Sequence, residues 1–545
     1  MKPLLPPRSP DSRETAVARL RGQTSWDLLV VGGGITGAAV ARDAALRGLK
    51  VALVEQHDLA CGTSSRSSRL LHGGLRYLEG LELSLVREGL VERRHLLDTA
   101  PGLARAVPFL YPVYVGDAEP LWRIHLGTLA YDTLAGAYGL GRRVLLTPAE
   151  IRDIEPALRS DGLEGAVLYR DGSTHDARLT LAVARAAAGA GTVLATRVAV
   201  VGLRRDSAGR VTGVEAADRI AGGGRETRHF ALTARATVLC TGPWEELHAE
   251  IPPVIRTARG THIAIHRDRL PVRHYLALTA PADGRLTFAL PHGDYTVLGT
   301  TDDDDPAPPA EVRPLPQDVD YLLATAAHAF PDVPLTREDV CGVWAGQRPL
   351  IADPEHGDPE DLSRRHQVVH GAPGLWILAG GKLTTHRRMA EDLLDALVET
   401  ELGGRAGPCR TATQPLLAGD LKRGTAILRA RGLPNSAVVE LAGLYGAALE
   451  ALAARVDDAA TLLAGQIAVA AEAEWCLALD DLLLRRLAPG PLDLYACLKS
   501  APQAAELLGE RLGWTVDERK QQLAAFHQGV TGDLQSAGLP ASLPA

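Results

Sequence analysis

Aromatic residues are scarce in this chain of 545 residues, where they make up 4% of the sequence. Proteins that hold single-stranded nucleic acids rely on stacking bases against aromatic side chains, so this scarcity argues against that class. The net charge of -8 argues against a general binder of polyanions and leaves room only for a local basic pocket. We therefore expect no nucleic-acid partner.

Paired cysteines are also missing, because the six cysteines are scattered and none stands in a CxxC pair. This spacing argues against a zinc ribbon, a disulfide framework and a thioredoxin-type centre. The motifs HExxH and EF-hand and the usual His/Cys ligand spacings are absent from the sequence, so no metal site is expected. An acidic run, Asp302–Asp305, stands just before Pro306 and predicts a solvated turn rather than a metal site.

Long apolar runs are a third absence. No run approaches the ~18 residues that indicate a membrane-spanning helix. The N-terminal segment lacks the apolar core of a secretory signal, and its several prolines predict an unstructured lead-in over residues 1–21. The sequence therefore predicts a cytoplasmic protein.

A complete βαβ unit follows the lead-in. A short apolar run, WDLLVV, is typical of a buried parallel strand, and a second run, VALVE, ends in Glu55. Between them lies GxGxxG on Gly32, Gly34 and Gly37, followed by apolar residues at helical spacing. Such glycines allow a tight turn and close approach of a pyrophosphate, and Glu55 can accept hydrogen bonds from a ribose. The unit predicts a dinucleotide-binding site.

Three later segments favour FAD as the dinucleotide. Residues 57–79 are dense in glycine and small hydroxyl residues, and such a loop can wrap a pyrophosphate and a flavin with Thr63, Ser64 and Ser65 as donors. Residues 236–244 and 374–397 predict two further returns of the chain to the same nucleotide. A second GxGxxG preceded by a strand is missing from the sequence, so we expect no separate nicotinamide site.

These segments also carry a family resemblance. SSRLLHGGLRYLE, GPW, GTHIAI, GTTDDDD, QRPL and GGKLTTHR occur in this order, and EWCLALDDLLLRR gives a weaker match near the C-terminus. Together they resemble the FAD-dependent (aerobic) glycerol-3-phosphate dehydrogenases. The resemblance implies a D-amino-acid-oxidase-like fold, a helical C-terminal domain and oxidation of sn-glycerol 3-phosphate to dihydroxyacetone phosphate. It also implies quinone as the electron acceptor and peripheral contact with the inner face of the cell membrane.

The resemblance assigns contacts residue by residue. Substrate contacts fall on Arg76, Tyr77, His262, Arg348 and Lys382. FAD contacts fall on Gly32, Gly33, Gly34, Ile35, Thr36, Gly37, Glu55, Thr63, Ser64, Gly242, Lys382, Leu383 and Thr384. Two positions depart from the family pattern, since His386 stands where tyrosine is common and Gln347 where a small or apolar residue is common. Both stand beside expected substrate contacts, so they weaken the substrate assignment and leave the cofactor assignment intact.

The chemistry of the side chains agrees with the resemblance. Arg76, Arg348 and Lys382 stand in separate glycine-bearing segments, and three converging cations suit a phosphate dianion. Only six of the 58 basic residues are lysine, which makes the lysine at position 382 notable. Oxidation of a secondary alcohol also requires a base for the hydroxyl proton. His262 is the expected base, His72 is the second choice, and Arg348 can stabilise the developing alkoxide.

Three alternatives stay open at this point. A glycerol-3-phosphate oxidase would use oxygen and form hydrogen peroxide. An amine or amino-acid oxidase would need a carboxylate clamp with an aromatic cage, which three cations and few aromatics argue against. A non-catalytic flavin sensor would hold a flavin that the substrate cannot reduce. The sequence is compatible with a homodimer.

The predicted fold class is α/β, with a Rossmann-like FAD-binding domain interleaved with an antiparallel substrate cap. Residues 22–90, 160–245 and 340–402 are assigned to the FAD-binding domain, with a helix that starts near Asp176. Residues 91–159 and 246–339 are assigned to the cap, where THIAIHRD, LTFALPH and YTVLGTT alternate like antiparallel strands. Residues 403–545 are rich in Ala and Leu at helical spacing and predict an all-helical domain.

Overall fold

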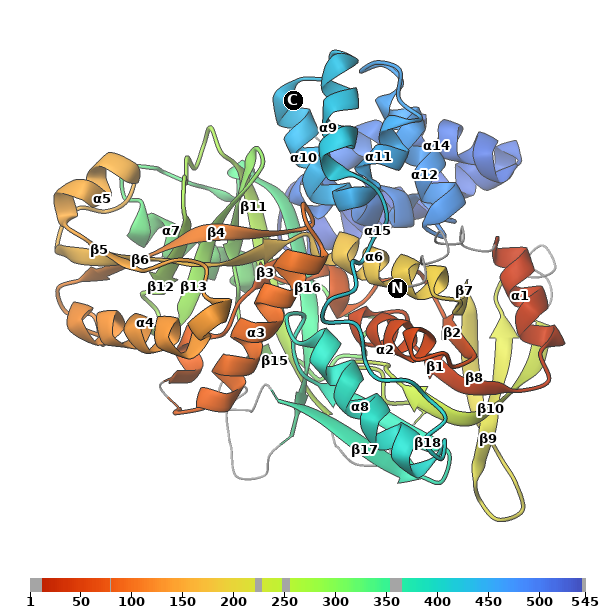
Figure 1. Ribbon diagram of the computed structural model, residues 1–545. Coiled ribbons are helices and arrows are strands. Elements are labelled where there is room, and N and C mark those ends of the chain that lie inside the picture. Colours follow the sequence, from red (N-terminus) through yellow and green to blue (C-terminus); the bar gives the residue numbers. More distant parts are fainter. Residues whose placement is uncertain (1–11, 79, 221–227, 248–254, 353–364, 542–545) are drawn as a thin grey trace.

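The computed structural model describes residues 12–78, 80–220, 228–247, 255–352 and 365–541, apart from the side chain of Arg76. Two large sheets lie side by side, and a group of helices from the last quarter of the chain packs across one end of both (Figure 1).

The first sheet is mainly parallel and is built around β1 (Trp26–Val31). Its strand order is β17-β18-β10-β1-β2-β7, so the chain leaves β1 toward β2 first and reaches the other side of β1 only later. The crevice at the carboxyl end of a strand where the order reverses is the usual ligand site of such sheets. The other strands are β2 (Val51–Glu55), β7 (Val193–Thr196), β8 (Val198–Arg205), β9 (Val211–Asp218), β10 (Arg228–Leu239), β17 (His366–Ala372) and β18 (Leu375–Gly380).

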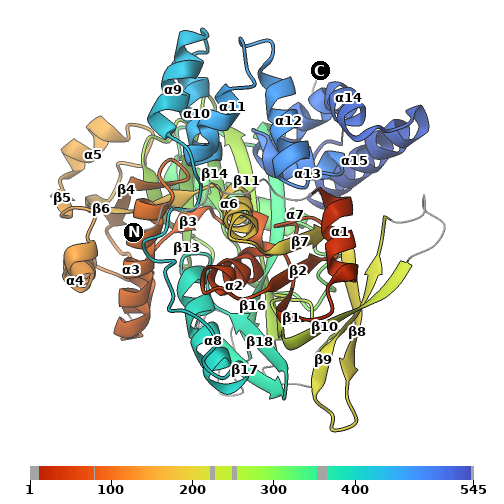
Figure 2. The same ribbon diagram turned by 45° about the vertical axis from the view of Figure 1, so that its right-hand side comes forward.

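Helices α2 (Ile35–Leu46), α6 (Asp176–Gly189) and α8 (His386–Thr400) cover one face of this sheet and share an apolar core with it. The other face packs against α1 (Arg13–Gly22) and the β8–β9 ribbon (Figure 2). The βαβ unit, the helix from Asp176 and the strand-turn-helix near residue 380 therefore form as predicted.

The expected unstructured lead-in is wrong for residues 12–21, which lie in or cap α1. Ser12 caps the helix by accepting a hydrogen bond from the backbone N–H of Thr15, and Ala16, Val17 and Leu20 are buried against the first sheet. The nearby prolines favour an unstructured segment, and the short apolar stripe forms a helix only because it packs against the first sheet. Residues 1–11 lie outside the described part of the chain.

The second sheet has ten strands and forms the cap. Its strands are β3 (Leu70–Leu71), β4 (Ala104–Tyr114), β5 (Val144–Leu146), β6 (Leu163–Thr174), β11 (Ile255–His266), β12 (Tyr275–Thr279), β13 (Leu286–His292), β14 (Tyr295–Gly299), β15 (Asp303–Asp304) and β16 (Val340–Ile351). The antiparallel neighbours β11, β14 and β13 contain the three alternating segments predicted for the cap. Helices α3 (Leu83–Thr99), α4 (Leu121–Ala135), α5 (Pro148–Ile154) and α7 (Pro316–Ala329) surround it.

Three strands lie in a different sheet from the one that the sequence predicts. β3 pairs with β6, β6 pairs with β4 and β16 pairs with β11, so all three belong to the second sheet although residues 22–90, 160–245 and 340–402 are assigned to the first. Alternating hydrophobicity identifies a strand but carries no information on its partner. β16 precedes β17 in the chain order and contacts β18, so it links the cap with the dinucleotide-binding sheet.

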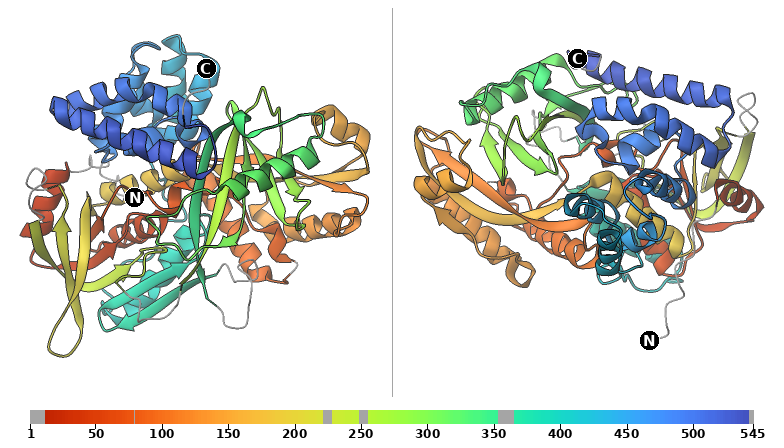
Figure 3. Two further views of the ribbon diagram at one scale, coloured as in Figure 1. Left: turned by 180° about the vertical axis from the view of Figure 1, so that it is seen from behind. Right: turned by 90° about the horizontal axis from the view of Figure 1, so that it is seen from above.

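In residues 403–541 every regular element is a helix, as predicted, and residues 403–420 form turns and loop before the first of them. Its helices are α9 (Leu421–Ala430), α10 (Asn435–Tyr445), α11 (Leu449–Ala453), α12 (Leu462–Ala473), α13 (Leu479–Asp481), α14 (Leu494–Leu512) and α15 (Val516–Ser536). Figure 3 shows them gathered on one side of both sheets. Among the described helices, one stretch, Asn435–Ala453, is long and apolar enough to cross a membrane, but half of it is buried in this domain.

Candidate active site

A cavity of about 1090 Å³ is lined by residues of both sheets. Most of the predicted site residues, far apart in the sequence, line this one space. They are Gly32, Gly33, Gly34, Ile35, Thr36, Glu55, Thr63, Ser64, Tyr77, Gly242, His262, Arg348, Lys382, Leu383 and Thr384. Of the remaining two, Gly37 lies behind the cavity wall, and the side chain of Arg76 lies outside the described part of the chain.

The glycine motif forms the end of the cavity next to β1. Gly32 has φ +112°, and a Cβ there would lie 2.4 Å from the carbonyl oxygen of Cys240. A Cβ at Gly37 would lie 2.0 Å from the carbonyl oxygen of Gly32. Only glycine fits either position, and the resulting close packing places the N-terminus of α2, with its positive dipole end, at the cavity.

Glu55 and the following loop fix the geometry around that N-terminus. The carboxylate of Glu55 accepts hydrogen bonds from the backbone N–H groups of Gly33 at 2.6 Å and His57 at 2.7 Å. Burial raises the pKa of Glu55, and the two N–H donors oppose that shift. Ser64 accepts a hydrogen bond from the backbone N–H of Ile35 at 2.9 Å, and Thr63 donates one to the carbonyl of Gln347 at 2.7 Å.

These residues fit an FAD molecule. A pyrophosphate needs the side-chain-free approach that Gly32–Gly34 provides beside a helix N-terminus. A ribose hydroxyl needs an acceptor, which Glu55 supplies at the end of β2. The cavity then continues past Thr63 and Gly242 as far as the turn at Lys382, which gives the length that a second nucleotide half requires.

The second sheet contributes His262 on β11 and Arg348 on β16. In their antiparallel pairing His262 lies opposite Trp344, and Gly260 lies opposite Gly346. Residues two apart share one face of a strand, and the two glycines make room there for neighbouring side chains. A Cβ on Gly260 would lie 2.4 Å from Nη2 of Arg348, and one on Gly346 would lie 2.7 Å from Cβ of Arg66. His262 is 2% exposed and stacks on Trp344, with ring centroids 5.2 Å apart. Burial, and next the charges of Arg348 and Arg69, lower the pKa of His262 to about 3, so its imidazole is neutral near pH 7.

Arg348 is held by the acidic run that the sequence analysis interpreted as a solvated turn. Its guanidinium donates to the carboxylate of Asp302 at 2.8 Å and to the hydroxyl of Thr300 at 2.8 Å. Asp303 and Asp304 form the short strand β15, and Asp305 is buried. The prediction of a solvated turn is therefore right only for Asp303 and Asp304, which are exposed, because arginines of β11 and β16 pair with this run and Asp305 is buried.

Lys382 approaches the cavity from the turn between β18 and α8. Gly380 and Gly381 have φ values of +69° and +80°, which allow the sharp turn there. The ammonium Nζ of Lys382 lies 3.8 Å from the centroid of the Tyr77 ring, a cation–π contact that joins the two expected substrate residues.

The two departures from the family pattern lie behind the cavity wall. His386 is buried at the start of α8 and its Nδ1 donates to the carbonyl of Leu383 at 2.7 Å, which supports the turn that carries Lys382. Burial lowers the pKa of His386 to about 4. Gln347 is buried, and its amide donates to the carbonyls of Asp305 and Ala307. Both side chains therefore support neighbouring segments instead of lining the main cavity.

Sequence reasoning missed the aromatic part of the cavity. Phe109, Tyr111, Tyr169 and Phe288 line it on the cap side. These residues stand on three different strands, and no local motif marks them. Several of the chain's few aromatic residues thus lie at the site, so the low aromatic content does not exclude an amine substrate. The cationic side chains of Arg348 and Lys382 still disfavour one.

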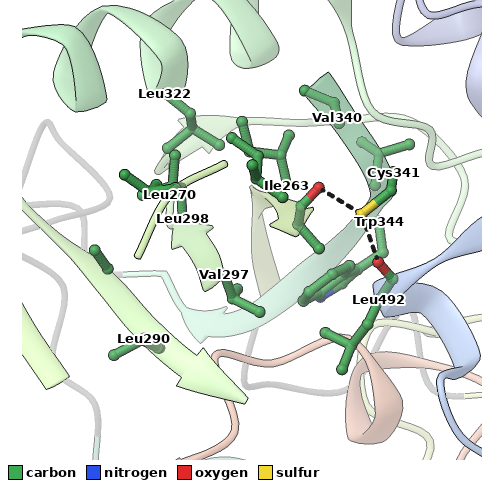
Figure 4. Close-up of a cluster of buried hydrophobic side chains, with 14 of the residues drawn as sticks. Ile263, Leu270, Leu290, Val297, Leu298, Leu322, Val340, Cys341, Trp344 and Leu492 are labelled. Carbon is green, nitrogen blue, oxygen red and sulfur yellow. Dashed lines mark hydrogen bonds between the residues drawn. The ribbon is translucent and has the colours of Figure 1, made fainter. Parts of the chain in front are cut away.

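A separate cluster of possible metal ligands lies at the junction of β11, β16 and α14. The ligand atoms of His266, Cys341 and Asp493 all lie within 4.8 Å of one another. The thiol of Cys341 donates to the carbonyls of Ala264 and Leu492, both at 3.3 Å (Figure 4). Burial raises the pKa of this thiol to about 12, so it stays protonated and bonded to the backbone. We interpret the cluster as a structural contact between the cap and the helical domain.

Comparisons with known proteins agree with this site. A family model described as FAD dependent oxidoreductase matches residues 27–394, and one described as the C-terminal domain of alpha-glycerophosphate oxidase matches residues 409–519. Glycerol-3-phosphate dehydrogenase 2 of Mycobacterium tuberculosis is 36% identical over 559 residues, covering 97% of this chain and 92% of the relative. The human mitochondrial glycerol-3-phosphate dehydrogenase is 33% identical over 555 residues, covering 95% of this chain and 74% of the relative.

A solved structure resembles the whole chain. The glycerol-3-phosphate dehydrogenase from Bacillus halodurans, complexed with FAD, superposes with a TM-score of 0.78 at 28% identity, covering 96% of this chain and 98% of that one. Glycine oxidase from Geobacillus kaustophilus, at 22% identity and a TM-score of 0.52, shares the fold over 70% of this chain. The matched domains, their order and the cavity together show that the chain is an FAD-dependent enzyme of the glycerol-3-phosphate dehydrogenase family.

Proposed function

We propose that this enzyme oxidises sn-glycerol 3-phosphate to dihydroxyacetone phosphate and passes the electrons from FAD to a membrane quinone. The observation that carries the substrate assignment is the convergence of Tyr77, His262, Arg348 and Lys382 on one cavity that also fits FAD. A guanidinium and an ammonium suit a phosphate dianion, and a neutral imidazole suits a hydroxyl proton. The names of the relatives support the same substrate.

In this proposal each protein group has one task. Arg348, oriented by Asp302, and Lys382, held against Tyr77, bind the phosphate and turn C2 of the substrate toward the cofactor. His262 takes up the hydroxyl proton because its ring is neutral at physiological pH. FAD supplies the hydride acceptor. His262 itself is almost fully buried, which keeps bulk water away from most of its ring.

The acceptor assignment rests on an apolar surface of the cap. Among the described residues, eight of the twelve exposed large hydrophobic side chains belong to residues 81–145. Helix α4 presents three of them on one face, Trp122, Leu126 and Leu129, while its opposite face is buried in the cap core. A helix that is apolar on both faces requires an apolar partner on the outer one.

This α4 apolar face lies close to the cavity. Ala118 and Glu119 just before α4, and Ile124 within it, line the same space as Tyr77. A lipid-soluble quinone entering beside α4 would therefore reach the cavity directly from a membrane. We accordingly place the enzyme in the cytoplasm, on the inner face of the cell membrane. Oxygen is the alternative acceptor, and it is favoured only by the family name of the C-terminal domain.

The substrate proposal is tested by mixing purified, FAD-loaded protein with sn-glycerol 3-phosphate without oxygen. We expect the flavin absorbance near 450 nm to bleach; an unchanged spectrum contradicts the proposal. Arg348→Ala should abolish bleaching while FAD stays bound, since Arg348 contacts the substrate side of the cavity. Admitting either a soluble quinone or oxygen to the reduced protein then identifies the faster acceptor.

The membrane assignment is tested by flotation with liposomes that contain anionic phospholipid. We expect the wild type to float and the variant Trp122→Ser, Leu126→Ser, Leu129→Ser to stay in solution with unchanged bleaching by substrate. Equal flotation of both proteins contradicts the role of the α4 apolar face.

A further inference from the structure

Ser68 stands between the cavity and the base. Its hydroxyl Oγ lies 2.8 Å from Nε2 of His262, and this hydrogen bond joins the loop after β2 to strand β11. Ser68 is half-buried and lines the cavity, whereas His262 is almost fully buried. The sequence analysis assigned no role to Ser68.

The imidazole of His262 is enclosed on its other sides. The indole of Trp344 stacks on the ring with an interplanar angle of 5°. A Cβ added to Gly299, the partner of His262 on β14, would lie 2.3 Å from its Cδ2. The Nδ1 atom is buried and has no hydrogen-bond partner among the described residues. Nε2 is hydrogen-bonded to Ser68, which lines the cavity, so Nε2 is the ring nitrogen that can exchange a proton on the cavity side.

The position of Ser68 is fixed by both of its neighbours in sequence. The backbone N–H and the hydroxyl of Ser67 both donate to the carboxylate of Asp176, at 2.9 and 2.7 Å. The guanidinium of Arg69 lies over the same Trp344 ring, 5.7 Å from its centroid. This support from both sides holds the Ser68 hydroxyl toward His262 and limits its movement.

Burial, and next the charges of Arg348 and Arg69, lower the pKa of His262 and make its ring a hydrogen-bond acceptor in the resting enzyme. Arg69 and Arg348 face the ring, and His292 is a further titratable neighbour. The two guanidinium charges oppose protonation of His262. A substrate phosphate dianion bound at Arg348 and Lys382 offsets those charges, so arrival of the substrate raises the proton affinity of the base.

We propose that Ser68 is a proton relay between the substrate hydroxyl and His262, an inference that rests on the proposed function. The C2 hydroxyl gives its proton to Oγ of Ser68 while the Ser68 proton passes to Nε2 of His262. The O–H bond of the substrate and its C2–H bond break, C2 loses a hydride with its two electrons to FAD, and the C2–O bond becomes a carbonyl. Ser68 ends the step unchanged, and His262 holds the proton.

The first test measures anaerobic flavin reduction by sn-glycerol 3-phosphate in a stopped-flow instrument. Ser68→Ala should slow reduction by about 10²- to 10⁴-fold, the usual contribution of general-base catalysis. Ser68→Thr keeps a hydroxyl and should recover most of that loss. Ser500→Ala is a control within α14, because the Ser500 hydroxyl donates to the carbonyl of Cys497 and does not line the cavity; it should reduce at the wild-type rate. All variants should retain one FAD per chain, which separates a relay from a folding defect.

The second test uses a double-mutant cycle with His262→Asn. Two residues that move the same proton act as a unit, so the double variant should be no slower than the slower single variant. In addition, the logarithm of the flavin reduction rate for Ser68→Ala should rise across pH 6–9, because hydroxide takes the place of the relay. The reduction rate of the wild type should not change over this range. The proposal is overturned if the rate losses of the two single variants multiply in the double variant. It is also overturned if the reduction rate of Ser68→Ala does not change with pH.

A proton inventory distinguishes relay from direct transfer. With the substrate deuterated at C2, the reduction rate in mixtures of H₂O and D₂O should follow a curve, because two protons move together. A straight line means one proton and overturns the relay, with Ser68 then only orienting His262. If the wild type itself is not reduced, the proposed function fails instead, so the two failures are distinguishable.

Discussion

The contact between Lys382 and Tyr77 illustrates how single side chains orient this site. The aromatic face attracts the ammonium and restricts a long, flexible side chain to one direction. Because lysine has four rotatable bonds, an unsupported ammonium would lose more conformational entropy when it binds the phosphate. Tyr77 therefore contributes to substrate affinity through Lys382.

This contact gives a first prediction. Tyr77→Leu removes the aromatic face, and we expect the dissociation constant for sn-glycerol 3-phosphate to rise about 5- to 30-fold, which corresponds to about 1–2 kcal/mol of cation–π energy. Tyr77→Phe keeps the ring and should bind within about threefold of wild type. Titration of the flavin spectrum with a non-oxidisable phosphate ester measures both constants. Equal loss in the two variants would mean that the hydroxyl, not the ring, makes the contact.

Buried histidines make stability depend on pH, and His386 provides a second prediction. Its pKa is lowered to about 4 in the folded protein, so at lower pH the unfolded chain binds the proton more readily. Stability must then fall as pH drops from about 6.5 toward 4. At pH 5 this single histidine lowers the free energy of unfolding by about 2 kcal/mol relative to neutral pH, since each pKa unit corresponds to about 1.4 kcal/mol.

The prediction is checked by comparing His386→Gln with the wild type at pH 7.5 and pH 5, with FAD in fixed excess. The loss of Tm on acidification should be smaller in the variant, because Gln does not titrate. His370→Gln is a matched control, because His370 is an exposed histidine with an ion-pair contact to Glu401. An identical acid shift in His386→Gln and wild type would contradict the assignment.

At the scale of whole elements, the packing of α2 against β1 decides whether the cofactor site exists. Gly37 lies in the first turn of α2 and contacts the carbonyl of Gly32 across the turn. A larger residue would push the helix N-terminus away from the strand end where the pyrophosphate binds. The motif thus acts through helix position as much as through direct contact.

The third prediction compares two glycine-to-alanine changes within helices. Gly37→Ala should lower the affinity for FAD by at least about 100-fold, since its Cβ would lie 2.0 Å from a backbone oxygen. Gly127→Ala in α4 meets no atom within 4 Å and should stabilise the protein by about 0.5–1 kcal/mol with FAD affinity unchanged. Fluorescence titration of apoprotein with FAD and thermal melts measure the two effects. Normal FAD binding by Gly37→Ala would show that the helix can move at no cost.

At the scale of the whole molecule, buried ion pairs fasten the helical domain to the dinucleotide-binding domain. Arg178 of α6 donates two hydrogen bonds to Glu474, at 2.7 and 2.8 Å, and Glu474 is fully buried. Arg486 pairs with Asp58 in the loop after β2, three residues from Glu55. The charges of Arg486 and Arg485 overcome burial and lower the pKa of Asp58 to about 2. The helical domain therefore supports the loop that carries the cofactor contacts.

The fourth prediction tests this junction. Glu474→Gln leaves buried arginines without their carboxylate, and we expect a loss of about 3–5 kcal/mol of stability. Glu472→Gln is a matched control two residues earlier, in the last turn of α12, because the ion pairs of Glu472 with Arg455 and Arg511 are exposed; it should cost no more than about 1 kcal/mol. Thermal melts and limited trypsin digestion measure the difference. Equal melting of the two variants would mean that apolar packing alone holds the domains together.

The sequence alone determined the local elements and the cofactor. WDLLVV, the glycine motif and Glu55 specify a βαβ unit because strand, turn and helix preferences act between neighbours in the chain. The helical C-terminal domain also follows from the local spacing of its apolar residues. Most site residues that local motifs marked do line the cavity.

The pairing of the strands and the surroundings of each site residue follow from contacts across the whole fold. The positions of β6 and β16 in the second sheet, and the order that brings Asp302 to Arg348 and Ser68 to His262, depend on contacts between distant segments. A single sequence records the preferences of neighbouring residues, whereas these contacts depend on register and burial across the whole fold. The pKa of His262 is lowered for the same reason, because its burial and its arginine neighbours come from separate parts of the chain.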